Sequence, residues 1–357
     1  MLTWLQPAEK VLREASSRVR MIAATTPVDL AGELERLFVS WNAGHVRPPR
    51  FDFPPRHDHR DLIDALERLA DKLVHEGPIG GVYADRAREM AAEAAISSAV
   101  GTPAFRIAAR RRFSRRDAFD EPADRLALDW LDEPCLEPAQ EAEEFVSSDD
   151  DLNPRSLLVR LRVELGWRKL PFRVVVARDA SALAATGDSF VQVAKNRKMT
   201  IADVERTVLH EIEGHVVPRC RANEQSLGIF ALGTRFGVDD QEGRAIGIER
   251  RAGHLTNARR RELALRHIAA RQVEQGAEFV DVVPRLVERG ALLNDALRIA
   301  ARVFRGGGLA REMVYLPAYL RVEAALKASP EIDRVLGAGR VSVPAADVLR
   351  AHVREMH

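Results

Sequence analysis

The sequence predicts a mostly helical α+β protein, in which an N-terminal helical region packs on a second part that carries a small β-sheet. Apolar residues recur at helical spacing in four segments of the first part: residues 8–23, 29–44, 61–77 and 84–101. The pattern changes after residue 151. Two short runs there, residues 171–179 and 189–199, are rich in β-branched and aromatic residues and are bounded by Gly, Pro and Asp, which is typical of strands.

The composition is that of a soluble globular protein, with 357 residues of which 46% are hydrophobic and 30% charged. A net charge of +1 offers no electrostatic reason to expect a nucleic acid as partner. No stretch approaches the ~18 consecutive apolar residues of a membrane span, and no secretion signal is evident, so we expect a cytoplasmic protein. The two cysteines, Cys135 and Cys220, exclude an all-cysteine zinc module and favour a reducing compartment.

A run of acidic residues divides the chain. Residues 132–151 contain nine acidic residues and are expected to form a solvated connection. We therefore predict an N-terminal helical region over residues 1–131 and a catalytic domain with a helical C-terminal part over residues 152–357. Within the first region, four prolines in residues 47–58 favour an extended segment rather than a helix.

The candidate functional motif is "HEIEGH", from His210 to His215. Thr200 and Asp203 form an approximate capping box that predicts a helix leading into it. Residues five apart lie about 140° apart on a regular α-helix, too far for both histidines to bind one metal. A π-type bulge would bring the two side chains together, and Gly214 makes such a distortion cheap.

Three acidic residues complete the candidate site. Glu242 lies in the first turn of another predicted helix, which we expect Asp239 or Asp240 to cap, and it would be the third metal ligand. Glu211 would stand beside the metal, where a carboxylate can take a proton from the attacking water and pass it to the leaving amine. Glu249, seven residues after Glu242 on the same face, could orient a ligand histidine. Two histidines and one carboxylate suit one zinc ion per chain.

The motifs also carry a family resemblance. "HEIEGHV", preceded by "TIADVERTVL" and followed by "DDQEGRAIGIE" and "RVFRGGGLAREMVYL", resembles the bacterial QEGLA-motif (flavohemoglobin expression-modulating) proteins, whose animal members are the microtubule-associated tyrosine carboxypeptidases. The resemblance covers about residues 157–319, and Arg244 stands where that family has leucine. It implies a zinc metallopeptidase with His210, His215 and Glu242 as ligands and Glu211 as the catalytic acid and base.

A carboxypeptidase needs a cation for the terminal carboxylate of its substrate, and arginine can bind a carboxylate through two hydrogen bonds. Arg311 is the first candidate, because it lies one helical turn from Tyr315, which could donate a hydrogen bond to the oxyanion of the tetrahedral intermediate. Lys195 and Arg197, at the end of the second predicted strand, are the next candidates.

The predicted function is therefore that of a zinc metallocarboxypeptidase. It would hydrolyse the C-terminal peptide bond of a protein or peptide tail, of the tyrosine type in the animal branch, by glutamate-assisted attack of a zinc-activated water. Two alternatives stay open at this point. One is a non-catalytic regulatory or peptide-binding protein that keeps the metal for structure, although an intact Glu211 argues against it. The other is an exopeptidase similar to dipeptidyl peptidase III, whose zinc helix has the same histidine spacing.

Overall fold

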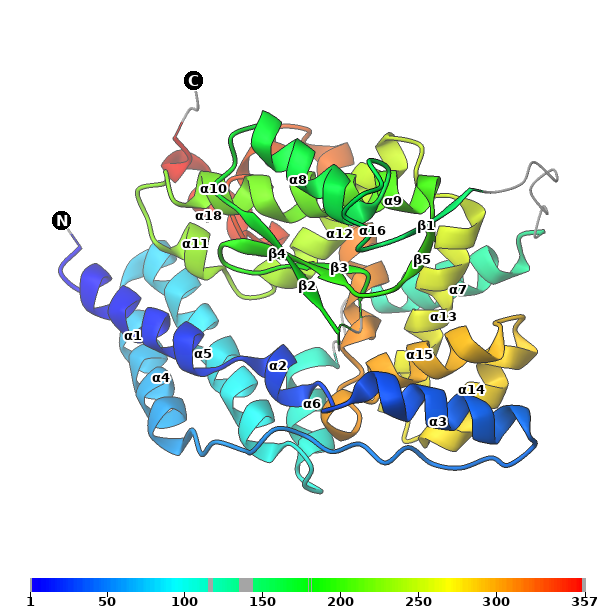
Figure 1. Ribbon diagram of the computed structural model, residues 1–357. Coiled ribbons are helices and arrows are strands. Elements are labelled where there is room, and N and C mark those ends of the chain that lie inside the picture. Colours follow the sequence, from blue (N-terminus) through cyan, green and yellow to red (C-terminus); the bar gives the residue numbers. More distant parts are fainter. Residues whose placement is uncertain (1, 115–117, 135–143, 179, 181, 355–357) are drawn as a thin grey trace.

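The computed structural model describes residues 2–114, 118–134, 144–178, 180 and 182–354. Helices dominate it, and the few strands form two small sheets beneath α8 and α9 (Figure 1). The predicted α+β class with mostly helical content is therefore confirmed. No helix within these ranges is long and apolar enough to cross a membrane.

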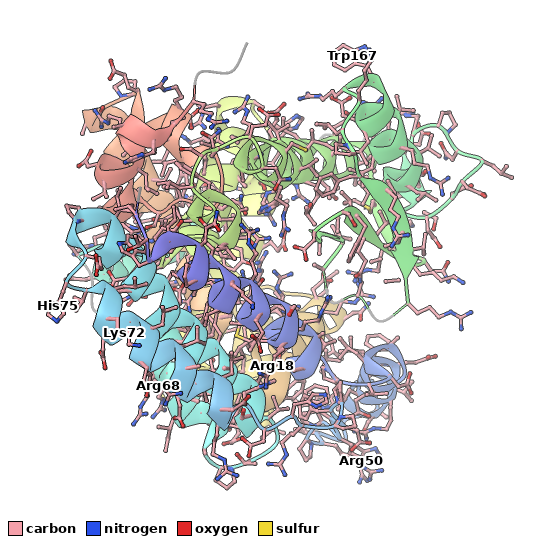
Figure 2. The ribbon with its side chains drawn as sticks, turned by 90° about the vertical axis from the view of Figure 1, so that its left-hand side faces the viewer. Arg18, Arg50, Arg68, Lys72, His75 and Trp167 are labelled. Atoms are coloured by element: carbon pink, nitrogen blue, oxygen red, sulfur yellow. The ribbon has the colours of Figure 1, made fainter. Side chains whose placement is uncertain are left out.

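The N-terminal region is helical, as predicted. Its helices are α1 (Leu5–Arg18), α2 (Met21–Thr25), α3 (Leu30–Asn42), α4 (Arg60–Leu73), α5 (Gly77–Ala99), α6 (Phe105–Phe113) and α7 (Asp120–Asp132). Leu12, Leu66 and Tyr83 form a buried core between α1, α4 and α5. The opposite side of α4 faces solvent, where Arg68, Lys72 and the nearby His75 point away from the molecule (Figure 2).

The proline-rich segment after α3 is extended, which confirms the prediction for residues 47–58. It runs along one side of the molecule from α3 to α4 (Figure 1). Asp52 in this segment forms an isolated antiparallel bridge with Val28, and the amide of Val28 donates to the carbonyl of Asp52 over 2.8 Å. The segment therefore links α3 and α4 without adding a helix.

The strands begin within the predicted acidic connection. They are β1 (Phe145–Ser147), β2 (Arg173–Ala177), β3 (Ala184–Thr186), β4 (Phe190–Ala194) and β5 (Lys198–Thr200). β1 pairs antiparallel with β5; the other sheet has the order β2-β4-β3, with β2 parallel and β3 antiparallel to β4. The two predicted strand regions are confirmed, whereas β1 and β3 were not predicted.

The predicted division of the chain stays a prediction. Residues 135–143 of the acidic connection lie outside the described residues. One large hydrophobic core joins both sides of the connection: it contains Leu37 of α3, Phe105 of α6 and Trp130 of α7 together with Phe304 and Tyr315 from the C-terminal part. The N-terminal helices therefore pack on the rest of the chain, as expected.

The motif helix lies against the larger sheet. α8 (Leu157–Trp167) and α9 (Ile201–Leu209) pack on the sheet face that carries Val191 and Val193. Thr200 caps α9, because its hydroxyl accepts a hydrogen bond from the amide of Asp203 over 3.1 Å. The helix then continues through a π-helical turn, η1 (His210–Val216), into α10 (Val217–Ala222).

The C-terminal part is helical and surrounds the motif helix. It contains α11 (Ile229–Leu232), α12 (Gly237–Arg251), α13 (Asn257–Glu274), α14 (Phe279–Glu288), α15 (Leu293–Val303), η2 (Arg305–Gly307), η3 (Arg311–Val314), α16 (Tyr315–Ala328), α17 (Ile332–Leu336), α18 (Val343–Leu349) and η4 (Arg350–His352). α12 lies between η1 and α16 and contacts both. This helix therefore connects the motif to the C-terminal core.

The prediction that Asp239 or Asp240 caps α12 was wrong. The cap position is Phe236, in the left-handed conformation with φ 65°, and its amide donates to the Glu89 carboxylate over 2.9 Å. Asp239 and Asp240 lie in the first turn and are buried. Asp239 accepts a hydrogen bond from Arg112 over 3.1 Å, and Asp240 accepts one from the amide of Val343 over 2.8 Å. Both carboxylates thus hold α12 to other helices instead of capping it.

Candidate metal centre

The π-helical turn brings the two motif histidines together, as the five-residue spacing predicted. The Nε2 atoms of His210 and His215 lie 3.3 Å apart, and the two rings meet edge to face. Gly214 has a further role that the sequence did not indicate. A Cβ at this position would lie 2.6 Å from the Cβ of Ala245, closer than two carbon atoms can approach. Glycine therefore lets α12 pack directly on η1.

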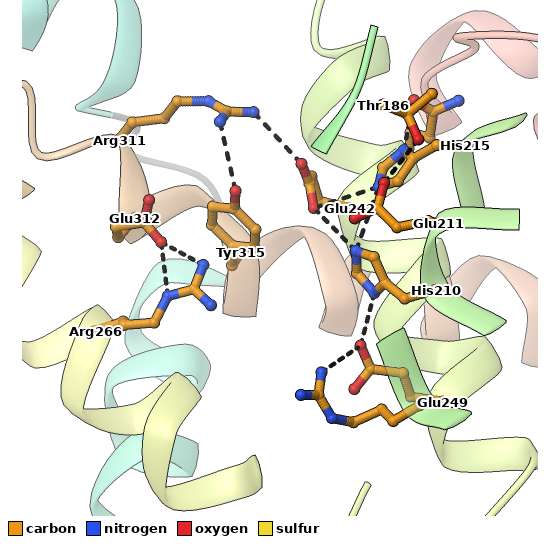
Figure 3. A network of polar contacts seen from close by, with 12 residues as sticks. Thr186, His210, Glu211, His215, Glu242, Glu249, Arg266, Arg311, Glu312 and Tyr315 are labelled. Carbon is orange, nitrogen blue, oxygen red and sulfur yellow. Dashed lines mark hydrogen bonds and ion pairs between the residues drawn. The ribbon is translucent and has the colours of Figure 1, made fainter. Parts of the chain in front are cut away.

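Glu242 on α12 completes the cluster. Its Oε2 atom lies 3.6 Å from Nε2 of His210 and 3.8 Å from Nε2 of His215 (Figure 3). Ligand atoms of the three side chains all lie within 4.8 Å of one another, and in the described part of the chain these residues form the only cluster suited to a metal ion. His210, His215 and Glu242 therefore converge on one point, and their role as metal ligands stays a prediction.

The spacing of these atoms fits a tetrahedral zinc site. Zinc binds histidine nitrogen and carboxylate oxygen at about 2.0–2.2 Å, so tetrahedral ligands lie roughly 3.3–3.6 Å from one another. The three observed separations are 3.3, 3.6 and 3.8 Å. Two imidazoles with one carboxylate are also a donor set that catalytic zinc sites use, with the fourth position left for water.

Each histidine is oriented through its other ring nitrogen. Nδ1 of His210 donates to Oε1 of Glu249 over 2.6 Å, and Nδ1 of His215 donates to Oε1 of Gln241 over 3.1 Å. Both hydrogen bonds leave the lone pair of Nε2 directed toward the cluster. Glu249 was predicted from the sequence for this role, whereas Gln241 was not. Its position directly before Glu242, at the start of the same helix, was the available signal.

Glu211 is buried next to the cluster, only 4% exposed. The hydroxyl of Thr186 donates to its Oε2 atom over 2.7 Å (Figure 3). Thr186 is the last residue of β3, at the edge of the sheet, and the carbonyl of Thr186 accepts a hydrogen bond from Arg219 over 3.2 Å. Thr186 was not predicted, because a strand of three residues has no recognisable sequence pattern. The strand thus holds one oxygen of the Glu211 carboxylate.

Arg311 and Tyr315 lie on another side of the cluster. Nη2 of Arg311 is 3.6 Å from Oε1 of Glu242, and Nη1 donates to the Tyr315 hydroxyl over 3.4 Å. Burial by itself would lower the pKa of Arg311, but Tyr315 and Glu242 raise it above its ordinary value. Burial raises the pKa of Tyr315, so this hydroxyl keeps its proton at neutral pH. The structure therefore places Arg311 beside Glu242 and Tyr315 beside Arg311.

A buried ionic cluster holds this side of the site in place. Glu312 is 1% exposed and accepts hydrogen bonds from Nε of Arg266 and Nε of Arg302, each over 2.7 Å. Burial opposes ionisation of Glu312, but the surrounding arginines lower its pKa to about 2. Arg302 also donates to the Tyr315 hydroxyl over 3.4 Å. The cluster fixes η3 and the start of α16, on which Arg311 and Tyr315 lie.

Lys195 and Arg197 are not members of the cluster of His210, His215 and Glu242. Lys195 is exposed at the end of β4. Arg197 lies near Arg298, Asp295 and Glu262, and burial together with Arg298 lowers its pKa to about 10. Neither side chain, both of which are among the described residues, makes a hydrogen bond or ion pair with the cluster. Their proposed role in binding the substrate carboxylate stays a prediction.

Nearly the whole chain matches one protein family. The model of the family described as microtubule-associated tyrosine carboxypeptidase matches residues 41–356. This span includes Glu211 and the side-chain cluster of His210, His215 and Glu242. The chain belongs to this family. Membership in the microtubule-associated tyrosine carboxypeptidase family confirms the resemblance that the motifs indicated, and it implies peptidase activity on a protein or peptide.

More distant comparisons add little. No curated protein matches the sequence significantly. A crystal structure from Colwellia psychrerythraea, described as that of a lipoprotein, is similar with a TM-score of 0.49 and 11% sequence identity, covering 89% of this chain and 72% of that chain. A likeness at this level carries no argument about the fold or the function.

Proposed function

We propose that the protein is a zinc-dependent carboxypeptidase, with His210, His215 and Glu242 as metal ligands. The observation that carries this proposal is the set of three donor atoms at tetrahedral spacing beside a buried glutamate. A zinc ion bound there would act as a Lewis acid that lowers the pKa of a water molecule and polarises the scissile carbonyl. The family description supports a carboxypeptidase over both a regulatory protein and a dipeptidyl peptidase.

Glu211 is the proposed general base and acid. The hydroxyl of Thr186 donates a hydrogen bond to Oε2 of Glu211 and restrains that oxygen. The same carboxylate can accept a proton from the attacking water and then donate it to the leaving amine. The predicted division of labour is therefore that Thr186 orients Glu211 and Glu211 moves the proton.

Tyr315 and Arg311 are the proposed contacts of the substrate. The Tyr315 hydroxyl accepts hydrogen bonds from Arg302 and Arg311, so its own proton is free to be donated to a developing oxyanion. Arg311 lies with Arg266, Arg302 and Arg305 in an arginine-rich region around Glu312. A guanidinium can bind a free C-terminal carboxylate through two hydrogen bonds, and Arg311 is the member of this group that lies next to Glu242.

The first experiment is mass spectrometry of a peptide library with varied C-terminal residues, incubated with the wild-type protein or with Glu211→Gln. We expect the wild type alone to remove one terminal residue, with tyrosine among the residues accepted. The variant should retain zinc and lose about 10²–10⁴-fold in rate, the usual contribution of a general base. Equal cleavage by a zinc-loaded variant, or no cleavage by a zinc-loaded wild type, would contradict the proposal.

A second experiment tests Arg311 with matched substrates. Arg311→Ala should raise KM for a peptide with a free C-terminal carboxylate and leave KM for its C-terminally amidated form unchanged. Equal effects on the two peptides would remove Arg311 from carboxylate binding. Lys195→Ala and Arg197→Ala, compared on the same peptides, test the other two candidates.

A further inference from the structure

On the side of its Nδ1 atom, His210 adjoins a series of buried charged side chains that are not themselves proposed metal ligands. Glu249 is 0% exposed and lies on α12, while Arg259 lies in the first turn of α13. Nε of Arg259 donates to Oε2 of Glu249 over 3.0 Å, and Nη2 donates to Oε1 over 3.1 Å. Both carboxylate oxygens are thus held by one planar guanidinium, the geometry in which an arginine binds a carboxylate most specifically.

The carboxylate held in this way is the one that orients a ligand histidine. Oε1 of Glu249 accepts from Arg259 and also from Nδ1 of His210, over 2.6 Å. A carboxylate bound by a bidentate fork cannot rotate about its own axis, so the direction of its bond to His210 is fixed. The ring of His210, and with it the direction of the Nε2 lone pair, is therefore determined by the position of α13.

Arg259 is itself anchored on two sides. Its Nη1 atom donates to Oε2 of Glu262 over 2.7 Å, and its backbone amide donates to the hydroxyl of Thr256, which caps α13, over 3.3 Å. The side chain is only 9% exposed. The chain of contacts runs from Glu262 through Arg259 and Glu249 to His210, and it joins two helices to the motif turn.

We propose that Arg259 is a positioning residue for the metal centre: through Glu249 it fixes the orientation of His210 and thereby sets the affinity of the site for its metal. This inference rests on the metal site of the proposed function. Arg259 touches neither the metal cluster nor any reacting atom, so its effect reaches the site through the Glu249 carboxylate alone. Partners of metal-binding histidines typically contribute about 10–100-fold to metal affinity.

The test is the zinc affinity of the full-length protein, measured by competition with a chelator, for the wild type, Arg259→Lys and Arg259→Gln. Lysine keeps the charge but has no planar fork. We expect a loss of zinc affinity of about 10–100-fold for Arg259→Gln, and a smaller loss for Arg259→Lys. The zinc-induced rise in melting temperature should fall in the same order, which provides a readout that does not depend on activity.

Arg36→Lys is the matched control. Arg36 on α3 holds Glu33 with the same planar fork, because its Nε atom donates to Oε2 over 2.7 Å and its Nη2 atom donates to Oε1 over 2.6 Å, and neither residue contacts a proposed metal ligand. It should lower the melting temperature of the metal-free protein slightly and leave zinc affinity unchanged. Zinc affinity of Arg259→Lys and Arg259→Gln within about twofold of the wild type would overturn the inference, as would an equal loss in Arg36→Lys. A wild type that binds no zinc would instead refute the proposed function.

Discussion

The two histidines of the proposed metal site are supported in different ways. His210 is held by a buried, charged pair, Glu249 and Arg259, that reaches from α12 to α13. His215 is held by the neutral amide of Gln241, whose own Nε2 atom finds no hydrogen-bond partner among the described residues. The support of His210 depends on a buried ion pair, and the support of His215 depends on close packing of η1 against α12. Substitutions in these two regions should therefore have different effects on stability and zinc binding.

The largest expected loss of stability comes from a substitution in the ion pair that supports His210. Glu249→Gln keeps the shape of the side chain but removes the buried negative charge between Arg259 and His210, and it leaves Arg259 paired with the more exposed Glu262. Removing one partner of a buried ion pair typically destabilises a protein by about 3–5 kcal/mol. Urea denaturation of the metal-free protein should show a loss of this size. A loss below about 1 kcal/mol would mean that the Glu249–Arg259 ion pair does not stabilise the region around His210.

His210 and His215 should also differ in their protonation state at neutral pH. Burial would lower the pKa of His210, but the carboxylates of Glu242 and Glu249 raise it to about 9, whereas burial lowers the pKa of His215 below its ordinary value. At pH 7, zinc should therefore displace about one proton, from His210. Apparent zinc affinity should fall by up to about tenfold per pH unit below pH 9.

Calorimetry in two buffers of different ionisation enthalpy measures this proton release directly. Release of two protons, or of none, would contradict the assignment. The stability of the metal-free protein should change in the opposite sense. The raised pKa of His210 stabilises the fold fully below about pH 6.5, its unfolded value, and this contribution is lost as pH rises through about 9.

Gly214→Ala tests the close packing of η1 against α12. The added methyl group would lie 2.6 Å from the Cβ of Ala245, so α12 must move away from η1 and carry Glu242 away from both histidines. We expect a loss of about 1–3 kcal/mol in stability, together with weaker zinc binding. Gly81→Ala is the control, because no atom lies within 4 Å of a Cβ placed there, and it should stabilise α5 by up to about 1 kcal/mol. Unchanged zinc binding in Gly214→Ala would refute the packing argument.

The smallest expected effect belongs to Gln241→Leu. It removes one neutral hydrogen bond to His215, typically about 0.5–1.5 kcal/mol, and removes a buried amide nitrogen that has no partner. Zinc affinity should therefore fall by less than in Arg259→Gln. A larger loss of zinc affinity in Gln241→Leu than in Arg259→Gln would contradict the expected difference between the two histidines.

Much of the candidate site could be predicted because it follows from helical periodicity. Glu242 and Glu249 lie two turns apart on one helix and therefore face one direction, whereas His210 and His215, five residues apart on another, do so only because of the π-helical turn. The need for a π-helical turn followed from the same geometry. The wrong prediction was a cap: Asp239 and Asp240 have the right chemistry for it, but Arg112, Arg321 and the amide of Val343 hold their carboxylates instead.

The sequence by itself determined the helical class, the strand regions that precede the motif helix and the residues able to bind a metal, because these depend on local spacing and side-chain chemistry. Only the tertiary structure decided that Thr186 meets Glu211, that Arg259 meets Glu249 and that Glu312 anchors the region of Arg311. Thr186 and Glu211 are brought together by sheet packing, and Arg259 by the docking of α13 on α12. Such contacts join separate elements, and their formation depends on how whole surfaces pack, which no local pattern records.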